Sequence, residues 1–231
     1  MMSDAAFRIL SIVSIAATIV CIAIHFACCG RKRRAAGPSG GAADMQRLGG
    51  LTRLAVIGTV LTGLVLAVTG LAPTVVFGER LEGYLLMCHV GCGGAFAVLL
   101  ALTAALLADD CRFRRHDAKC CTGEGGGRPS GKFDAGQKAA FWLLLALGLV
   151  VVLTMVLSML PIFGPDGLEL MRDIHRCCGL LMLLIALVHC YQTMTVCRGR
   201  WSSLLSGKVN SDWARHYRSL WWQAVRGEEG K

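Results

Sequence analysis

Five apolar stretches alternate with polar connections along this chain of 231 residues. Each stretch has 23 to 25 residues, and a helix needs about 20 residues to cross the hydrocarbon core of a bilayer. Hydrophobic residues make up 55% of the sequence, which is too many for a soluble domain of this length. The pattern predicts an all-α integral membrane protein whose five transmembrane helices cover Phe7–Cys29, Leu54–Phe77, Tyr84–Ala108, Ala139–Phe163 and Ile174–Cys197.

The net charge of +9 is concentrated in three of the connections. Of 24 Lys and Arg residues, 20 lie in Gly30–Arg53 (six), Asp109–Lys138 (seven) and Arg198–Lys231 (seven). Basic loops collect on the cytoplasmic side of a membrane, so we expect the N-terminus outside and the C-terminus inside a bacterial cytoplasmic (inner) membrane. The lipid bilayer suits these basic loops because its headgroups are anionic. We therefore expect no nucleic-acid partner.

The spacing of the apolar stretches predicts four regions. Residues 1–29 form a transmembrane anchor helix, 30–52 a basic, Gly-rich cytoplasmic linker, 53–200 a four-helix bundle and 201–231 an amphipathic cytoplasmic tail. We expect the anchor to be retained and not cleaved as a signal peptide, because no basic region precedes it and Arg31-Lys32-Arg33-Arg34 follows it. The tail has four Trp residues and suits either the membrane interface or a docking surface.

The twelve cysteines do not indicate a disulfide framework. Nine lie in the predicted helices, where cysteine behaves as a small apolar residue. Cys111, Cys120 and Cys121 lie in a cytoplasmic connection, where thiols stay reduced. No Cys-x-x-Cys occurs in the sequence, which disfavours c-type haem attachment, structural zinc and an iron–sulfur cluster.

Two histidines of the last apolar stretch suggest a chemical function. His175 and His189 are fourteen residues apart, which on an α-helix places them about 40° apart around the axis and about 21 Å apart along it. Ionisable residues inside a membrane span are costly and mark functional sites. We expect each imidazole to bind one of two stacked b-type haems, so that an electron could cross the membrane.

A third histidine, His89, is predicted at the depth of His175, near the outer side. The two could supply both axial ligands of one haem, and the small residues after each would let a flat macrocycle approach the backbone. Ordinary packing of buried histidines and small residues is the alternative. Arg80, Arg172 and Arg176 are expected at the same level, where they could pair with haem propionates or extend to the interface.

The inner level has His189 but no obvious second imidazole in the four-helix bundle. His25 lies near the cytoplasmic end of the first helix and is a candidate second ligand, although a single histidine near an interface has simpler explanations. His116 and His216 lie in charged cytoplasmic segments and are expected to be solvated.

Asp134 opens the fourth predicted helix from the cytoplasmic side and is followed by Gly136 and Gln137. An aspartate here could cap the helix. The free N–H groups of the first turn would also attract a carbonyl or an anion. A quinone headgroup fits this position, at the level of His189.

These residues resemble the cytochrome b (gamma) subunit of membrane-bound formate dehydrogenases. The resemblance covers about Arg53 to Trp222. It is carried by Lys132-Phe133-Asp134-Ala135-Gly136-Gln137-Lys138, by Ile174-His175 with Gly179, by His189-Cys190-Tyr191, and by Gly207-Lys208-Val209 with Trp213-Ala214-Arg215-His216.

The resemblance implies a cytochrome b domain with two b haems that reduces menaquinone or another quinone on the cytoplasmic side. His89 and His175 would bind the outer haem, His189 would bind the inner haem, and Asp134, Gly136 and Gln137 would line the quinone pocket. Two departures stand out: Val56 replaces a histidine ligand of the inner haem, and Asp134 replaces an asparagine. They suggest that His25 supplies the missing ligand and that Asp134 handles a proton.

The predicted function is therefore the quinone-reducing, electron-transfer subunit of a formate dehydrogenase, an oxidoreductase complex. Electrons would come from an iron–sulfur (beta) subunit, and formate oxidation would belong to a catalytic (alpha) subunit, since this chain shows no such centre. A cytochrome b subunit of a hydrogenase or of another respiratory reductase is the nearest alternative. A membrane transporter using His and Cys, or an anchor without cofactors, belongs to a different class.

Overall fold

The computed structural model describes residues 2–30, 44–115, 117, 131–160, 162–195 and 204–229. Several residues named above lie outside the described residues: His116, Cys120, Cys121, Cys197, Trp201 and most of the basic linker. The side chains of Cys29 and His216 are likewise not described.

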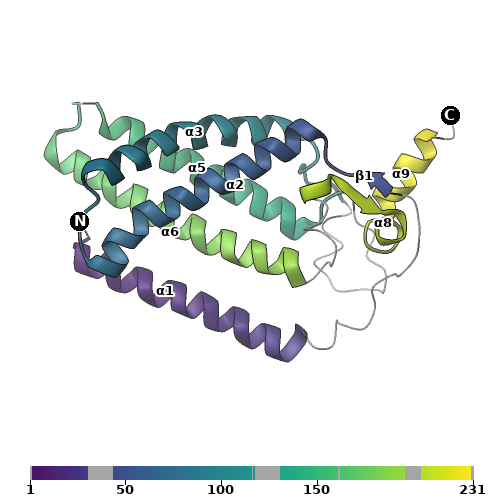
Figure 1. The fold of residues 1–231 in the computed structure, drawn as a ribbon, viewed down its shortest axis with the longest axis horizontal. Helices are drawn as coiled ribbons and strands as arrows, with labels where there is room; N and C mark the ends of the chain where they lie inside the picture. Colours follow the sequence, from purple (N-terminus) through teal and green to yellow (C-terminus); the bar gives the residue numbers. More distant parts are fainter. Residues whose placement is uncertain are drawn as a thin grey trace.

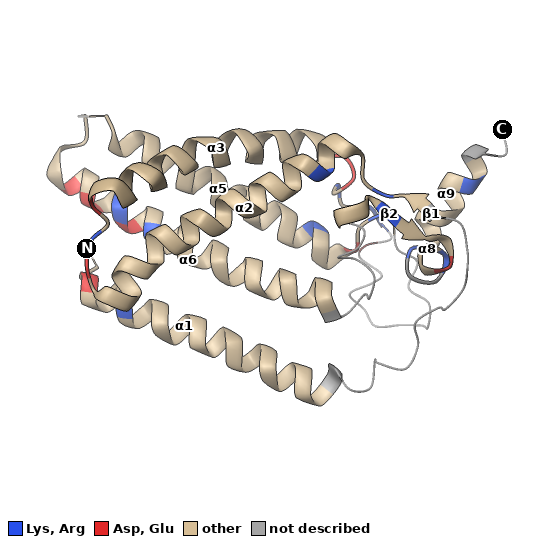
Figure 2. Cartoon of the chain, in the orientation of Figure 1, with Lys and Arg blue, Asp and Glu red and all other residues tan. Residues whose placement is uncertain are grey.

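Within the described residues, five helices are long and apolar enough to cross a membrane, which confirms the predicted all-α, multi-pass architecture. Charged side chains lie near the two ends of these helices and leave their middle parts uncharged (Figure 2). The helices are α1 (Asp4–His25), α2 (Gly50–Ala72), α3 (Gly83–Leu107), α5 (Ala135–Ser158) and α6 (Gly164–Thr195), with helical continuations at Phe26–Gly30 after α1 and Pro73–Phe77 after α2.

The helices run side by side along the long axis of the molecule (Figure 1). α2 packs along α3 and α5 packs along α6, so that two helical hairpins form the four-helix bundle. α1 lies outside this bundle, against α6 and the continuation Pro73–Phe77. The chain thus adds one helix to a bundle of four, as the sequence predicts.

Helix α6 begins ten residues earlier than the sequence suggests. The segment before Ile174 contains Gly164, Pro165 and several charged residues, which is typical of a loop. Gly164 has φ 62°, a left-handed conformation that favours glycine, and proline is tolerated in the first turn of a helix. A helix of 32 residues is about 48 Å long, so its polar first turns extend beyond the hydrocarbon core.

Local hydrogen bonds explain where two of the helices begin. Ser3 caps α1, since its hydroxyl accepts a bond of 3.2 Å from the N–H of Ala6. Asp134 caps α5, as the sequence suggests, and forms a capping box with Gln137. Inside the helices, threonine hydroxyls donate to the carbonyl four residues earlier, which satisfies polar groups that a bilayer cannot.

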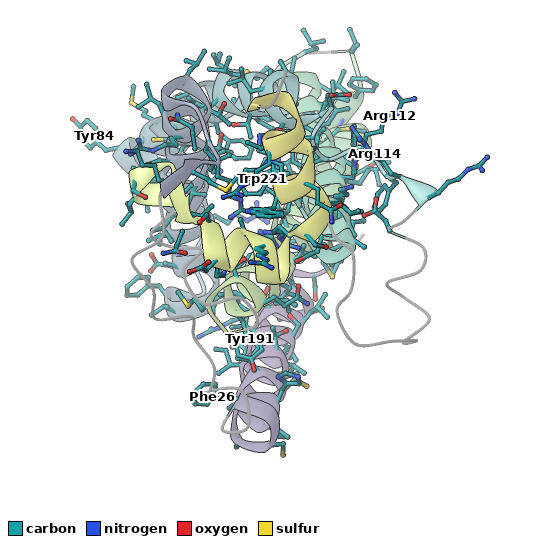
Figure 3. The ribbon with its side chains drawn as sticks, turned by 90° about the vertical axis from the view of Figure 1, so that its right-hand side faces the viewer. Phe26, Tyr84, Arg112, Arg114, Tyr191 and Trp221 are labelled. Atoms are coloured by element: carbon teal, nitrogen blue, oxygen red, sulfur yellow. The ribbon has the colours of Figure 1, made fainter. Side chains whose placement is uncertain are left out.

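A small cap covers one end of the bundle; we define the cap as residues 44–48 and 204–229. Strand β1 (Asp44–Gln46) pairs antiparallel with β2 (Lys208–Asn210), and α8 (Ser211–Tyr217) and α9 (Ser219–Glu229) follow. Its core contains Val209, Trp213 and Ala214, packed against Met45, Trp221 and Trp222. Parts of the predicted linker and of the predicted tail therefore pair with each other, and Figure 3 shows the cap in front of the helix ends.

An apolar cluster of Leu48, Leu107 and Cys111 joins the cap end of the bundle to the linker, and Val56 packs against it. Burial raises the pKa of the Cys111 thiol to about 11, so the thiol stays protonated at neutral pH. The cysteines whose side chains are described all carry free thiols.

Candidate functional site

Two histidines face each other inside the bundle, near the end opposite the cap. His89 lies in the second turn of α3, and His175 lies about three turns into α6. Their ring centroids are 6.3 Å apart and their planes differ by 65°. Two metal–imidazole bonds of about 2.0 Å in line with the two rings give a centroid separation of about 6 Å. The pair therefore has the spacing of two axial ligands of one metal ion.

The hydrogen bonds of the two rings indicate which ring nitrogen is available to bind a metal. His89 Nδ1 lies 2.8 Å from the hydroxyl of Thr69, whose own proton is donated to Val65. While Thr69 donates to Val65, His89 Nδ1 carries the proton of the bond between the two side chains. His175 Nδ1 lies 3.1 Å from a backbone carbonyl of α5, which can only accept. Both rings then leave Nε2 with a lone pair for a metal, as in metal sites where a hydrogen bond to the other ring nitrogen orients the histidine.

Small residues and a second threonine complete this site. A Cβ atom added to Gly70 would lie 2.9 Å from Cε1 of His89, so a larger residue would displace the ring. The hydroxyl of Thr154 lies 3.3 Å from Nδ1 of His175 and donates its own proton to α5 carbonyls. Four helices thus contribute to the site: α2 and α5 orient the imidazoles that α3 and α6 carry.

Replacing Thr69 by valine is expected to lower haem affinity at this site about 10- to 100-fold, because the His89 ring loses the hydroxyl that orients it. Thr62→Val is a matched control, since Thr62 lies on the same helix and donates to helix carbonyls. Haem retention during dialysis against an apo-haem acceptor measures the effect. Equal retention in the two variants would contradict the assigned hydrogen bond.

The three outer arginines of the sequence analysis lie at the end opposite the cap, in a network of carboxylates. Asp4, at the start of α1, pairs with Arg176 at 2.8 Å and with Arg80 at 3.1 Å. Arg176 also pairs with Asp173 at 2.8 Å, and its guanidinium lies 4.8 Å from the Phe7 ring. The structure brings Arg80 and Arg176 together on one carboxylate, the chemical group of a haem propionate.

The third arginine is held more loosely, and α1 makes further contacts at this end. Arg172 lies 3.8 Å from Glu169 within α6. Arg8 of α1 donates to backbone carbonyls of Val75 and Val76. The contacts of Asp4 and Arg8 attach α1 to the bundle at the level of His89 and His175.

His25 and His189 lie nearer the cap, and the contact that His25 makes is with Tyr191. His25 Nδ1 lies 2.6 Å from the hydroxyl of Tyr191, and the two rings meet edge to face with centroids 5.6 Å apart. Tyr191 lies beside α1 in the end-on view of Figure 3. His189 and Tyr191 are two residues apart on α6, so their side chains point in directions that differ by about 160° around the helix axis. His189 therefore points to a different side of α6 from the one that His25 contacts.

The three residues expected to bind a quinone lie at the cap end, in the first turn of α5. Asp134 Oδ1 accepts a bond of 2.8 Å from the N–H of Gln137, and the Gln137 side chain accepts one of 3.2 Å from the N–H of Asp134. A Cβ atom added to Gly136 would lie 3.8 Å from Oε1 of Gln192 on α6. Arg218 of the cap donates to both Asp134 and Gln137.

A buried ion pair lies one turn further along α5. The ammonium group of Lys138 is 2.8 Å from Asp117 and 3.0 Å from the carbonyl of Arg112. The side chains of Lys138 and Asp117 are only 3% and 5% exposed. This pair fastens the connection after α3 to the start of α5, next to the proposed quinone position.

Sequence reasoning missed Thr69, Thr154, Asp4, Tyr191 and Arg218. Threonines in an apolar helix are a weak signal, because the sequence does not show whether a hydroxyl bonds only to its own helix or also to a neighbouring one. Asp4 and Arg218 are charged residues at segment ends, and their spacing along the chain does not reveal which helix they reach.

The fold is a helical membrane bundle in which the imidazoles of His89 and His175 face each other. A family model described as prokaryotic cytochrome b561 matches residues 47–207, and the chain belongs to this family. Membership implies binding of haem b, which agrees with the His89–His175 pair. The matched region covers the four-helix bundle, includes only residues 47–48 and 204–207 of the cap, and leaves α1 outside.

Curated relatives are subunits of one kind of complex. The chain is 29% identical over 105 residues to the Escherichia coli protein "Formate dehydrogenase, nitrate-inducible, cytochrome b556(Fdn) subunit", an alignment covering 44% of this chain and 48% of that protein. It is 25% identical over 101 residues to the E. coli protein "Formate dehydrogenase, cytochrome b556(fdo) subunit", covering 42% and 47%. The chain spans about half the length of the curated relatives it matches.

Proposed function

We propose that this chain is the cytochrome b subunit of a formate dehydrogenase complex and passes electrons from an iron–sulfur partner through haem b to a quinone. The observation that carries the proposal is the His89–His175 pair, with centroids 6.3 Å apart and both Nδ1 atoms hydrogen-bonded. The names of the curated relatives supply the kind of complex.

The residues of the first site fit a haem. His89 and His175 would hold its iron through Nε2, and Thr69 and Thr154 would keep both rings in place. Haem b supplies one-electron redox chemistry when bound, and the surrounding protein sets its potential through ligands, hydrogen bonds and burial. Arg80, Arg172 and Arg176 are proposed to pair with the propionates, in competition with the carboxylates that contact them in the structure.

We place a second haem at His189, nearer the cap. His189 lies within about 40° of the His175 direction on α6 and is therefore directed toward the bundle. His25 is the proposed second ligand from α1; in the tautomer whose Nδ1 donates to the Tyr191 hydroxyl, Nε2 keeps a lone pair for a metal. Its position on the Tyr191 side of α6 is unfavourable for sharing a haem with His189.

The quinone site is proposed at the start of α5, where Asp134, Gly136 and Gln137 meet Gln192 and the cap. A helix N-terminus favours a carbonyl oxygen that gains negative charge during reduction. Menaquinone is the proposed substrate. Reduction of the quinone takes two electrons and two protons, and we assign the protons to the cytoplasmic side.

The proposed orientation follows from the basic connections. We place the cap end in the cytoplasm and the His89–His175 end outside the bacterial inner membrane, toward the iron–sulfur (beta) and catalytic (alpha) subunits. An electron that crosses in this direction moves one charge through the membrane. The free energy of this transfer changes by about 2.3 kcal/mol per 100 mV of membrane potential.

Purification of the tagged chain from its own membranes tests the proposal. We expect an iron–sulfur subunit to co-purify, a pyridine haemochrome spectrum of haem b, and rapid reduction of that haem by formate. A menaquinone analogue should then reoxidise the haem. A preparation that binds haem b but is reduced by another donor and not by formate would contradict the formate dehydrogenase assignment, and a colourless preparation would contradict the cytochrome function.

A further inference from the structure

Arg218 connects the cap to the first turn of α5. It lies between α8 and α9, far from α5 in the sequence. Its guanidinium donates to Oδ2 of Asp134 at 2.8 Å and to the side-chain oxygen of Gln137 at 3.2 Å. One arginine of the C-terminal region thus contacts two of the three residues proposed to line the quinone site.

The cap holds Arg218 in a fixed position. Arg218 is only 2% exposed, and its guanidinium lies 6.0 Å from the ring of Trp213. Its N–H donates to the carbonyl of Ala214 at 2.7 Å, and its carbonyl accepts from the N–H of Trp222 at 2.9 Å. Because backbone bonds on both sides and an aromatic ring restrain it, the guanidinium is pre-organised toward α5.

A second arginine attaches the cap to the bundle. Arg47, which follows β1, lies 5.6 Å from the Trp213 ring and 5.2 Å from the Phe133 ring. Phe133 directly precedes Asp134. The cap and the start of α5 therefore form one packed unit, and a change at Arg218 acts on the first turn of α5.

The contacts of Arg218 decide what Asp134 can do. Oδ1 of Asp134 accepts from the backbone of Gln137, and Oδ2 accepts from Arg218. A guanidinium and a helix N-terminus both favour the charged form of a carboxylate. Asp134 held in this way is an anchor for the first turn and for Gln137, and not a proton donor to the quinone.

We propose that Arg218 is a positioning residue of the quinone site, which acts through Asp134 and Gln137 and makes quinone binding depend on the C-terminal cap. The inference rests on the proposed function, since it assumes that the quinone binds at the start of α5. Without Arg218, Asp134 and Gln137 lose a shared donor, and the geometry of the first turn is no longer fixed.

Quinone kinetics of the assembled complex test this inference. We expect Arg218→Gln to raise KM for a menaquinone analogue about tenfold or more, because hydrogen bonds to charged groups are among the strongest in proteins. Formate oxidation with a soluble dye, and haem content, should stay unchanged. Arg218→Lys should recover part of the loss. Arg226→Gln is the matched control, since Arg226 is an exposed arginine of α9 that lies over Trp222, and it should leave KM unchanged.

A double-mutant cycle with Asp134→Asn isolates the contact between the two side chains. The increase in KM of the double variant Arg218→Lys with Asp134→Asn should be smaller than the product of the increases in the two single variants. Because this cycle does not use Arg218→Gln, it also serves if that variant does not assemble. Independent effects, or an unchanged KM in Arg218→Gln while Gln137→Ala raises it, would overturn the inference and leave the quinone site in place. An unchanged KM in Gln137→Ala and Asp134→Asn as well would overturn the proposed quinone site itself.

Discussion

Replacing His175 by alanine is expected to abolish haem binding at the end of the bundle opposite the cap and to stop electron transfer from the iron–sulfur partner to the quinone. The substitution removes one of two facing imidazoles, and within the described residues only His89 and His175 approach each other in this way. The remaining His89 cannot by itself give a six-coordinate, low-spin haem. Haem-to-polypeptide stoichiometry and low-temperature spectra of the purified protein measure the loss.

His116→Ala is the matched control for this variant, because the sequence places that histidine in a charged connection between two helices. It should retain the full haem content. Full haem content with unchanged spectra in His175→Ala would show that the pair is not the axial ligand set.

The same spectra test whether His25 is a ligand of the second haem. If His25 is a ligand of the second haem, His25→Ala removes one low-spin signal and leaves the signal of the first haem. An unchanged pair of signals would limit His25 to its hydrogen bond with Tyr191, which is the contact that the structure shows.

Replacing Lys138 by methionine is expected to destabilise the cap end of the protein by about 3–5 kcal/mol, because it leaves Asp117 as a buried charge without its ammonium partner. Both side chains are almost fully buried, so water cannot replace the lost contact. Thermal unfolding in detergent, followed by near-ultraviolet circular dichroism, measures the change.

Lys132→Met is the matched control. Lys132 pairs with Asp110 at 2.6 Å, but the two side chains are 24% and 34% exposed, so its loss should cost less than about 1 kcal/mol. The double variant Lys138→Met with Asp117→Leu should recover most of the stability, since replacing both members of a buried pair by apolar groups is often neutral. Equal destabilisation by Lys132→Met and Lys138→Met would contradict this account.

The sequence predicted the number of spanning helices correctly and their limits to within a few residues at most ends. The exception is the start of α6, because a polar segment rich in Gly and Pro has the composition of a loop although its first residues can start a helix. The sequence also identified Asp134 as a helix cap, since capping depends on neighbours within one turn.

Other features depended on contacts between distant segments. The pairing of Asp44–Gln46 with Lys208–Asn210 joins two regions that the sequence presents as a flexible linker and a separate tail. Three-residue strands have no periodic signal of their own. The attachment of α1 through Asp4 to Arg80 and Arg176 was equally invisible, because the residues are 76 and 172 positions apart.

The sequence by itself determined that this is a helical membrane protein with histidines inside its spans, because hydrophobicity and helical spacing are properties of one segment at a time. The sequence also predicted that His89 and His175 lie at one depth. Only the tertiary structure decided how their rings face each other, which hydroxyls hold them, and that His25 lies on Tyr191. It also showed that Arg218 reaches Asp134. These relations depend on how helices rotate and pack against one another, and the period of a single helix does not specify them.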